Sequence, residues 1–343
     1  MKRSTILTVL AGLLVIAAFA LAGCASEEGP EGASGAQGAP GPQGPEGAAG
    51  PPGEAMTTAD LSCTECHDDS SRITGKKTAW EESTHGSGTA YLRGGSSSCA
   101  GCHSGGAFSE RIAAGLDPNE LEAGDPNPTR QDCRACHQIH TTYTGADFGL
   151  ETTDPVDLFA LEGMTFDGGL GNLCANCHQP RRVIGEVVDG MIEITSTHWG
   201  PHHGAESAMM LGVTGAGDVE STTSPHYAVV EDTCVSCHLG DARSHTFDPV
   251  LATCQGCHTD AEDFDINGVQ TEVQAGLAEL EEGLIALGWL DEEGHPTVTS
   301  VPEKEAVALW NWIFIAHEDK SSGVHNPAYT LALIEAGLAA LEP

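Results

Sequence analysis

The stretch CRACHQIHTTY, residues 133–143, contains two cysteines, a histidine directly after the second cysteine, and another histidine three positions later. Its first five letters, Cys-x-x-Cys-His, form a unit that recurs through the chain of 343 residues. The copies are Cys63-Cys66-His67, Cys99-Cys102-His103, Cys133-Cys136-His137, Cys174-Cys177-His178, Cys234-Cys237-His238 and Cys254-Cys257-His258. Of the 13 cysteines, only Cys24 lies outside these motifs.

Disulfides and zinc ribbons also use cysteine pairs of this spacing, but neither needs a histidine directly afterwards. Histidine makes up 16 of the 343 residues, so six such histidines would arise by chance with a probability on the order of 10⁻⁸. Covalent attachment of c-type haem does need this arrangement, because two thiols bind the porphyrin and the adjacent histidine coordinates the iron. The repeat therefore predicts six covalently attached haem c groups.

Each iron needs a second axial ligand unless one site is left open for catalysis. The methionines do not follow the distribution of the motifs, so the other histidines are the candidates. His140 would have to round the edge of the macrocycle to reach the iron above His137, and three residues span at most about 10 Å. We therefore expect His140 to ligate a neighbouring haem.

From about Leu61 to Leu341 the chain resembles exported multihaem c-type cytochromes with bis-histidine ligation, a family associated with respiratory and extracellular electron transfer. The stretches that carry the resemblance include CRACHQIHTTYTGADFGL, WGPHHGAESAMMLG, SPHYAVVEDTCVSCH, RSHTFDPVLATCQGCH and NWIFIAHEDKSSGVHNPAYTLAL. The resemblance implies distal iron ligation by His140, His202, His226, His245 and His325. His85, which follows the first motif, is the remaining candidate.

Four histidines are left without a predicted iron. His198 competes with His202 for the same role, and this choice stays open. His203 adjoins a predicted ligand and is expected to line a haem edge. His295, in a polar turn, is expected to be solvated, and His317 is expected at a helix end.

The amino terminus predicts export. Residues 1–23 have the basic start and short apolar run of a signal peptide, and Leu21-Ala22-Gly23-Cys24 resembles the lipobox of bacterial lipoproteins. Lipid on Cys24 would anchor the protein to a membrane, and the absence of aspartate after Cys24 favours the outer membrane, on its periplasmic or cell-surface face. An uncleaved anchor or an ordinary signal peptide remains the alternative.

Residues 24–55 predict a stalk, because glycine falls on every third position from Gly29 to the end of this segment. Two interpretations stay open. A collagen triple helix would make the protein a homotrimer, whereas a single extended chain would be a spacer roughly 80 Å long.

Composition limits the partners. Lysine and arginine number 14 against 50 acids, and the net charge of −36 argues against nucleic acid and against an anionic membrane surface. Basic redox proteins, other cytochromes among them, would be attracted instead. Aromatic residues make up only 5% and glycines number 43, so we expect the haems rather than side chains to fill most of the interior.

These features predict a mainly irregular and α-helical multihaem cytochrome with a haem-packed core and few strands. The haem-attaching body covers 56–262, and a C-terminal helical segment, 263–343, packs on the haems; a separate helical binding module is the alternative. A hairpin is expected over Val183–Ile194, turning at Asp189-Gly190. Helices are expected over Val269–Leu287, from Pro302 through Phe314, and from Pro327 to Leu341.

The favoured function is electron transfer along bis-histidine haems between membrane-side and external redox partners, so the protein is not expected to be an enzyme. The alternative is a reductase of nitrogen or sulfur oxyanions with one open haem. The absence of a CxxCK motif, the scarcity of tyrosine and the supply of histidines favour the first interpretation. Assembly into a trimer, a filament or neither stays open.

Overall fold

The computed structural model describes residues 71–202 and 204–342. The predicted signal peptide, Cys24, the stalk, the first motif Cys63-Cys66-His67 and His203 lie outside these residues. Residues 56–343 belong to one compact unit. Among the described residues, no helix combines the length and the apolar character needed to cross a bilayer.

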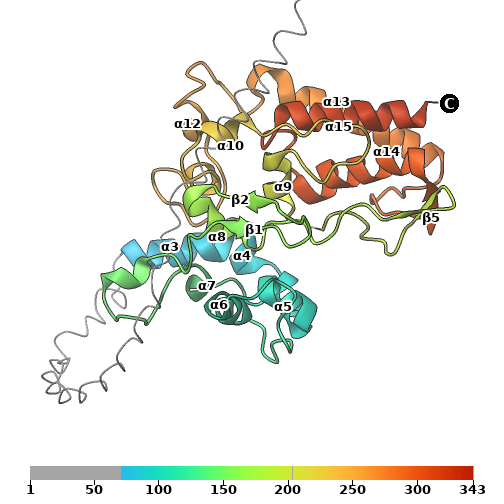
Figure 1. Ribbon diagram of the computed structural model, residues 1–343. Helices are drawn as coiled ribbons and strands as arrows, with labels where there is room; N and C mark the ends of the chain where they lie inside the picture. Colours follow the sequence, from blue (N-terminus) through green and yellow to red (C-terminus); the bar gives the residue numbers. More distant parts are fainter. Residues whose placement is uncertain (1–70, 203, 343) are drawn as a thin grey trace, which may run out of the picture. The chain divides into compact units, whose positions relative to one another are not determined.

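Short helices dominate the part of the unit that carries the motifs, and three longer helices form its C-terminal part (Figure 1). The helices are α3 (Ser71–Glu82), α4 (Thr84–Ser87), η1 (Ala90–Gly95), α5 (Ser97–His103), α6 (Gly105–Ala114), α7 (Cys133–Cys136), η2 (Gly145–Phe148), η3 (Gly169–Gly171), α8 (Asn172–Ala175), α9 (Glu206–Leu211), α10 (Pro225–Val229), α11 (Cys234–His238), α12 (Leu251–Cys254), η4 (Ile266–Gly268), α13 (Val269–Ala286), α14 (Glu303–Ile313), η5 (Phe314–Asp319) and α15 (Pro327–Leu341).

The strands are short: β1 (Val156–Asp157), β2 (Thr165–Phe166), β3 (Val187–Val188), β4 (Met191–Glu193) and β5 (Ser300–Pro302). They form one antiparallel pair, β1-β2, and one antiparallel sheet in the order β3-β4-β5. The prediction of a mainly helical and irregular fold with few strands is confirmed.

The predicted hairpin is present, with shorter strands than expected. Its turn residues Asp189 and Gly190 have φ values of 51° and 77°, the left-handed pair that a two-residue hairpin turn requires. On its other side, β4 pairs with β5 through Ile192 and Val301. This pairing joins the segment after the fourth motif to the strand that directly precedes α14.

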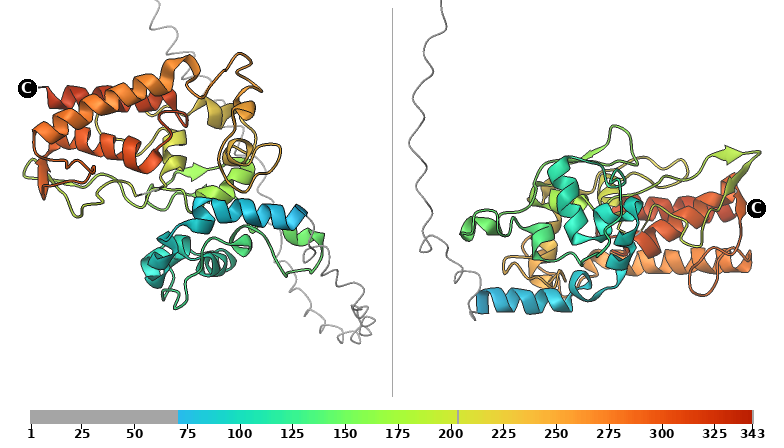
Figure 2. Two further views of the ribbon diagram at one scale, coloured as in Figure 1. Left: turned by 180° about the vertical axis from the view of Figure 1, so that it is seen from behind. Right: turned by 90° about the horizontal axis from the view of Figure 1, so that it is seen from below.

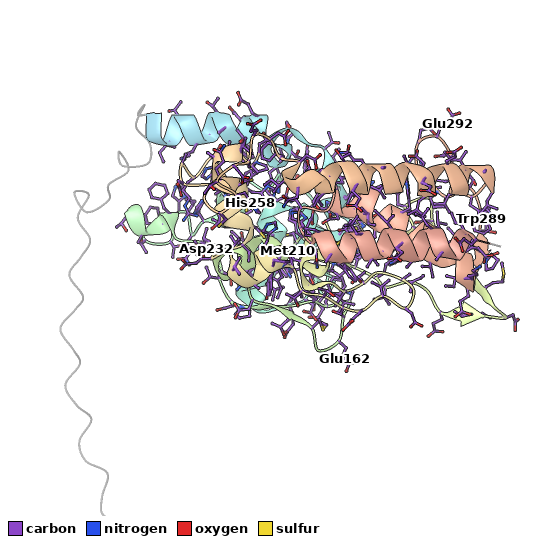
Figure 3. The ribbon with its side chains drawn as sticks, turned by 90° about the horizontal axis from the view of Figure 1, so that it is seen from above. Glu162, Met210, Asp232, His258, Trp289 and Glu292 are labelled. Atoms are coloured by element: carbon purple, nitrogen blue, oxygen red, sulfur yellow. The ribbon has the colours of Figure 1, made fainter. Side chains whose placement is uncertain are left out.

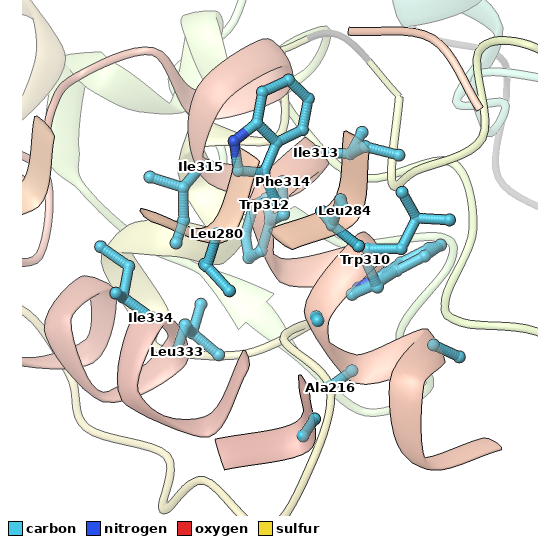
Figure 4. Packing of buried hydrophobic residues seen from close by; sticks show 14 of the residues in the cluster. Ala216, Leu280, Leu284, Trp310, Trp312, Ile313, Phe314, Ile315, Leu333 and Ile334 are labelled. Atoms are coloured by element: carbon cyan, nitrogen blue, oxygen red, sulfur yellow. The ribbon is translucent and has the colours of Figure 1, made fainter. Parts of the chain in front are cut away.

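The C-terminal helices α13, α14 and α15 lie side by side in both directions of view (Figures 1 and 2). They surround a core in which Trp310, Phe314, Leu280, Leu284 and Leu333 are fully buried (Figure 4). Their predicted positions are confirmed, and Asn326 caps α15. The expectation of a thin side-chain core does not hold here, because the few tryptophans are concentrated in this segment.

The motif-bearing part contains much smaller apolar clusters. One comprises Phe108, Ala135 and Leu173, and another is built around Phe166 and Leu158. Such small clusters bury little apolar surface for the length of chain involved. In this part the thin side-chain core that the composition predicts is present.

Hydrogen bonds attach the C-terminal helices to the motif-bearing part. The Asn326 side-chain amide donates to the carbonyl oxygens of Met209 at 2.9 Å and Thr222 at 2.6 Å, and its Oδ1 accepts from the backbone of Tyr329. The Tyr329 hydroxyl in turn accepts from the backbone N–H of Gly215. These bonds connect the helical segment to the motif-bearing part within one compact unit.

Replacing Asn326 by alanine should destabilise the protein by about 2–4 kcal/mol, because one buried and one partly buried carbonyl oxygen lose their donor and α15 loses its cap. The measurement is the midpoint of urea unfolding, followed by far-UV circular dichroism. Asn127→Ala, at an exposed asparagine, is the control and should leave the midpoint unchanged. Equal midpoints for the two variants would contradict the role given to Asn326.

Candidate haem centres

Each described motif forms about one helical turn. At the C-terminal end of α7, the backbone N–H of His137 donates to the carbonyl oxygen of Cys133 at 2.9 Å. The fourth and sixth motifs have the equivalent bond. In the second and fifth motifs the helices α5 and α11 extend through the histidine. One helical turn places residues i, i+3 and i+4 on the same face. Both thiols and the imidazole of a motif are thereby directed to one side, as covalent attachment to one porphyrin requires.

A second imidazole faces the motif histidine in all five described motifs. The pairs, with the distance between ring centroids, are His103 with His202 at 6.0 Å, His137 with His245 at 6.2 Å, His178 with His85 at 6.1 Å, His238 with His325 at 6.2 Å, and His258 (Figure 3) with His226 at 6.3 Å. Every partner comes from a segment outside the motif that it faces.

This spacing matches the donor set that a bis-histidine haem needs. Two imidazoles on opposite sides of one metal ion, with metal–nitrogen distances of about 2.0 Å, have ring centroids about 6.3 Å apart. Direct stacking of two rings in van der Waals contact would bring them closer than this. The five pairs therefore fit an iron between the rings.

The histidines that the sequence left open are also placed. His202 faces His103, whereas His198 faces His295 at 5.5 Å. His295 lies in the expected polar turn with 38% of its side chain exposed, and its ring also contacts those of His198 and His317.

His140 lies outside the five pairs. Its ring stacks on Tyr143 at 5.5 Å, and the ring facing His137 is that of His245. His140 is thus the predicted ligand that remains once the five described motifs are paired. The sixth motif histidine, His67, lies outside the described residues.

Hydrogen bonds to the outer ring nitrogen orient several of these imidazoles. Backbone carbonyl oxygens accept from Nδ1 in four cases: Phe148 from His137, Phe247 from His238, Val324 from His226 and Arg243 from His245, all at 2.8–2.9 Å. A bond at Nδ1 fixes the tautomer and leaves Nε2 to bind the metal.

Carboxylates take this position at two other imidazoles. Glu206 Oε2 lies 3.0 Å from Nδ1 of His178, and Asp319 Oδ1 lies 2.7 Å from Nδ1 of His325. The negative charge of Glu206 raises the pKa of His178 to about 9. Burial lowers the pKa of His325, but Asp319 outweighs it and raises the pKa to about 9. A carboxylate at Nδ1 holds the ring in place and makes it more basic, an arrangement found at metal-bound histidines.

His85 has the opposite environment. Burial, with a smaller contribution from the neighbouring His178, lowers its pKa to about 4. The imidazole is therefore neutral at pH 7, which is the form that binds a metal.

Phe247 connects three of the pairs. Its ring lies 4.9 Å from that of His85 and 6.0 Å from that of His245, and its carbonyl oxygen accepts from His238. Its backbone has a φ of 60°, a left-handed conformation that is costly for an aromatic residue and persists only where the surroundings enforce it. His140 and His202 have positive φ values too, 66° and 96°.

The described motifs lie next to one another. The side chain of Cys102 contacts that of Cys177, and the side chain of Cys174 contacts that of Cys234. The fourth motif is thus in contact with the second and the fifth. None of the ten described cysteines forms a disulfide, so their thiols remain available for attachment.

Arg111 provides a further test of whether haem fits. Its guanidinium is 2% exposed, donates to the backbone and side-chain oxygens of Asn176, and lies close to the thiols of Cys102 and Cys177. Within the described part of the chain its Nε has no hydrogen-bond partner. A buried cation with a spare donor suits an anionic group such as a haem carboxylate.

Sequence reasoning did not identify Glu206, Asp319, Phe247 or Arg111. Glu206 lies four residues after His202 and Asp319 six residues before His325, which are spacings with no recognised meaning. One sequence signal was available for Arg111: the chain contains few lysines and arginines, yet this arginine lies among the apolar residues of α6.

No family model and no curated protein matches the chain. Two solved structures resemble it. One is the outer cell wall cytochrome OcwA, with a TM-score of 0.48, 21% identity, and coverage of 78% of this chain and 50% of OcwA. The other is the undecahaem cytochrome from the S-layer of Carboxydothermus ferrireducens, with a TM-score of 0.41, 20% identity, and coverage of 72% and 38%. This chain therefore spans half or less of the length of these cytochromes.

Replacing Phe247 by alanine should change two axial pairs at once, because the rings of His85 and His245 both lose a packing partner and the left-handed backbone is released. We expect at least two low-spin signals in the EPR spectrum of the oxidised protein to shift or broaden. Phe264→Ala, at a phenylalanine that is 41% exposed, is the control. A Phe247→Ala spectrum identical to the wild type would show that the ring does not hold these ligands.

Proposed function

We propose that this protein is an exported multihaem c-type cytochrome that transfers electrons through six covalently attached, bis-histidine haems. The observation that carries the proposal is the set of five imidazole pairs, each opposing a Cys-x-x-Cys-His histidine at 6.0–6.3 Å. Haem supplies reversible one-electron chemistry when bound.

The residues of the chain would attach, orient and enclose these groups. The cysteines would hold the porphyrins covalently, and two imidazoles would close both axial positions of each iron. Closed positions exclude substrates, which favours a carrier or conduit over a reductase. The carbonyl oxygens and carboxylates at Nδ1 would hold the rings in place during oxidation and reduction.

The sixth iron would belong to Cys63, Cys66 and His67. His140 is the predicted distal ligand that the five described pairs leave over, so we assign it to this iron. The sequence CRACHQIH would then serve two neighbouring haems, one through His137 and one through His140.

The same proposal includes the features of the amino terminus. Lipid on Cys24 would tether the protein, most consistently with the outer membrane, and the Gly-x-y stalk would hold the haem-bearing unit away from the lipid. The excess of acids would favour basic redox partners such as other cytochromes. A homotrimer through the stalk is compatible with this arrangement.

The proposal predicts that the fully oxidised protein contains six haems per chain, all low-spin. Low-temperature EPR, with haems counted independently by the pyridine haemochrome assay, checks this directly. His140→Ala should convert one iron to the high-spin form and leave the haem count at six. A high-spin iron in the wild type would favour the reductase function, and its response to nitrite should then be examined.

Asp319→Asn should raise the midpoint potential of one haem by roughly 50 mV, which is about 1 kcal/mol for a one-electron couple. The asparagine oxygen can still accept from His325, so the change removes the charge and keeps the shape. A spectroelectrochemical titration measures the potential. Asp263→Asn, at an exposed acid, is the control, and an equal effect of the two substitutions would mean that only total charge matters.

A further inference from the structure

Three histidines without a predicted haem gather at one small cavity. His198, His295 and His317 all line it, together with Trp199, Gly294 and Glu318. The ring of His198 lies 5.5 Å from that of His295, and the ring of His295 lies 6.5 Å from that of His317. The cavity has a volume of about 10 Å³, roughly the space of one water molecule and enough for one metal ion.

The three side chains come from different elements that the fold brings together. His198 follows β4, His295 lies in the loop between α13 and β5, where Glu292 is labelled in Figure 3, and His317 lies in the π-helix η5. The pairing of β4 with β5 and the hydrogen bond from Ile194 to Thr299 hold the first two segments side by side. The π-helical turn is an uncommon conformation that occurs frequently at functional sites.

From these positions we propose that His198, His295 and His317 form a binding site for a divalent transition-metal ion of the zinc class. Two imidazoles bound to one tetrahedral ion have ring centroids about 5 Å apart. His198 and His295 are close to this spacing, but the ligand nitrogens of the three rings do not all lie within 4.8 Å of one another. Completing the site therefore requires the rings to turn or move inward, His317 by at least about 1 Å. Three imidazole ligands suit zinc, copper or nickel and not calcium or magnesium.

The surroundings of His295 support a ligand role. Asp291 Oδ2 lies 3.6 Å from Nδ1 of His295, and Asp291 itself is held by the backbone N–H groups of Glu293 and His295. This distance is longer than a hydrogen bond, so Asp291 supports the ring electrostatically and would have to move closer to bond Nδ1, the arrangement typical of metal-bound histidines.

Gly294 keeps space open at His317. A Cβ at residue 294 would lie 2.3 Å from Nε2 of His317, and Gly294 has a φ of 81°. Any side chain there would block this nitrogen and strain the backbone. On the other side, Trp312 packs against the His317 ring at 5.0 Å and is itself fixed by a hydrogen bond to Leu277.

The acidic turn is an alternative metal site. One oxygen each of Asp291 and Glu293 and one nitrogen of His295 lie within 4.8 Å of one another. A site made of these groups would take calcium as readily as zinc and would not use His198 or His317. The two sites therefore differ in ion preference and in the substitutions that abolish them.

The test is calorimetric titration of zinc chloride into the haem-loaded protein after treatment with a chelator, followed by counting bound zinc after dialysis. We expect one equivalent, with affinity reduced at least tenfold in His198→Gln and in His317→Gln and about tenfold in Asp291→Asn. Glu293→Gln is the control and should retain the site, and calcium should not compete. Haem absorbance confirms that each variant is folded, and His198 is exposed, so its replacement is tolerated.

No zinc retained by the wild type, or zinc retained equally by the His198 and His317 variants, would overturn the proposal. Loss of the site in Glu293→Gln alone would assign it to the acidic turn and also overturn the proposal. The site uses none of the ligands assigned to haem, so these outcomes leave the proposed electron-transfer function untouched.

Discussion

The structure depends on one repeated constraint: an imidazole from a distant segment is held about 6 Å from the imidazole of a motif. A single helical turn fixes the geometry of each motif, but no local interaction determines the position of the second imidazole. The chain between the two histidines must adopt a path that brings them together, and this explains why so much of the motif-bearing part is irregular. It also accounts for the left-handed backbone at His202 and Phe247, since strain of this kind survives only where tertiary contacts enforce it.

The C-terminal helices supply the rigidity that the motif-bearing part lacks. Their large side-chain core fixes the end of η5 and the start of α15, and that junction carries Asp319, Val324 and His325. These residues bond to, or form, the imidazoles of two pairs. A segment far from the motifs in sequence thus determines the orientation of ligands at the fifth and sixth motifs.

The sequence predicted what short-range chemistry determines. The turn at Asp189-Gly190 and the start of α15 at Pro327 follow from residue type alone, and both were placed correctly. Tertiary packing determines the rest: the core around Trp310, the π-helical end of α14 and the second partners of the imidazoles. His198 and His202 could not be separated from sequence, because they lie four residues apart and only the fold decides which one faces His103.

Electrostatics acts on two scales in this molecule. Most acids in the described part of the chain are exposed to water, where a charge is largely screened beyond about 8 Å at physiological ionic strength. They therefore govern encounters with partners more than the properties of an interior site. Glu206 and Asp319 differ because both are bonded to ring nitrogens, Asp319 fully buried and Glu206 partly buried. Buried charges are screened much less, so Asp319 acts on His325, and Glu206 acts on His178 and also on His325. The electronic differences among the imidazole pairs therefore follow from the placement of these two carboxylates, and the net charge of the chain is a separate property that evolution can alter without disturbing them.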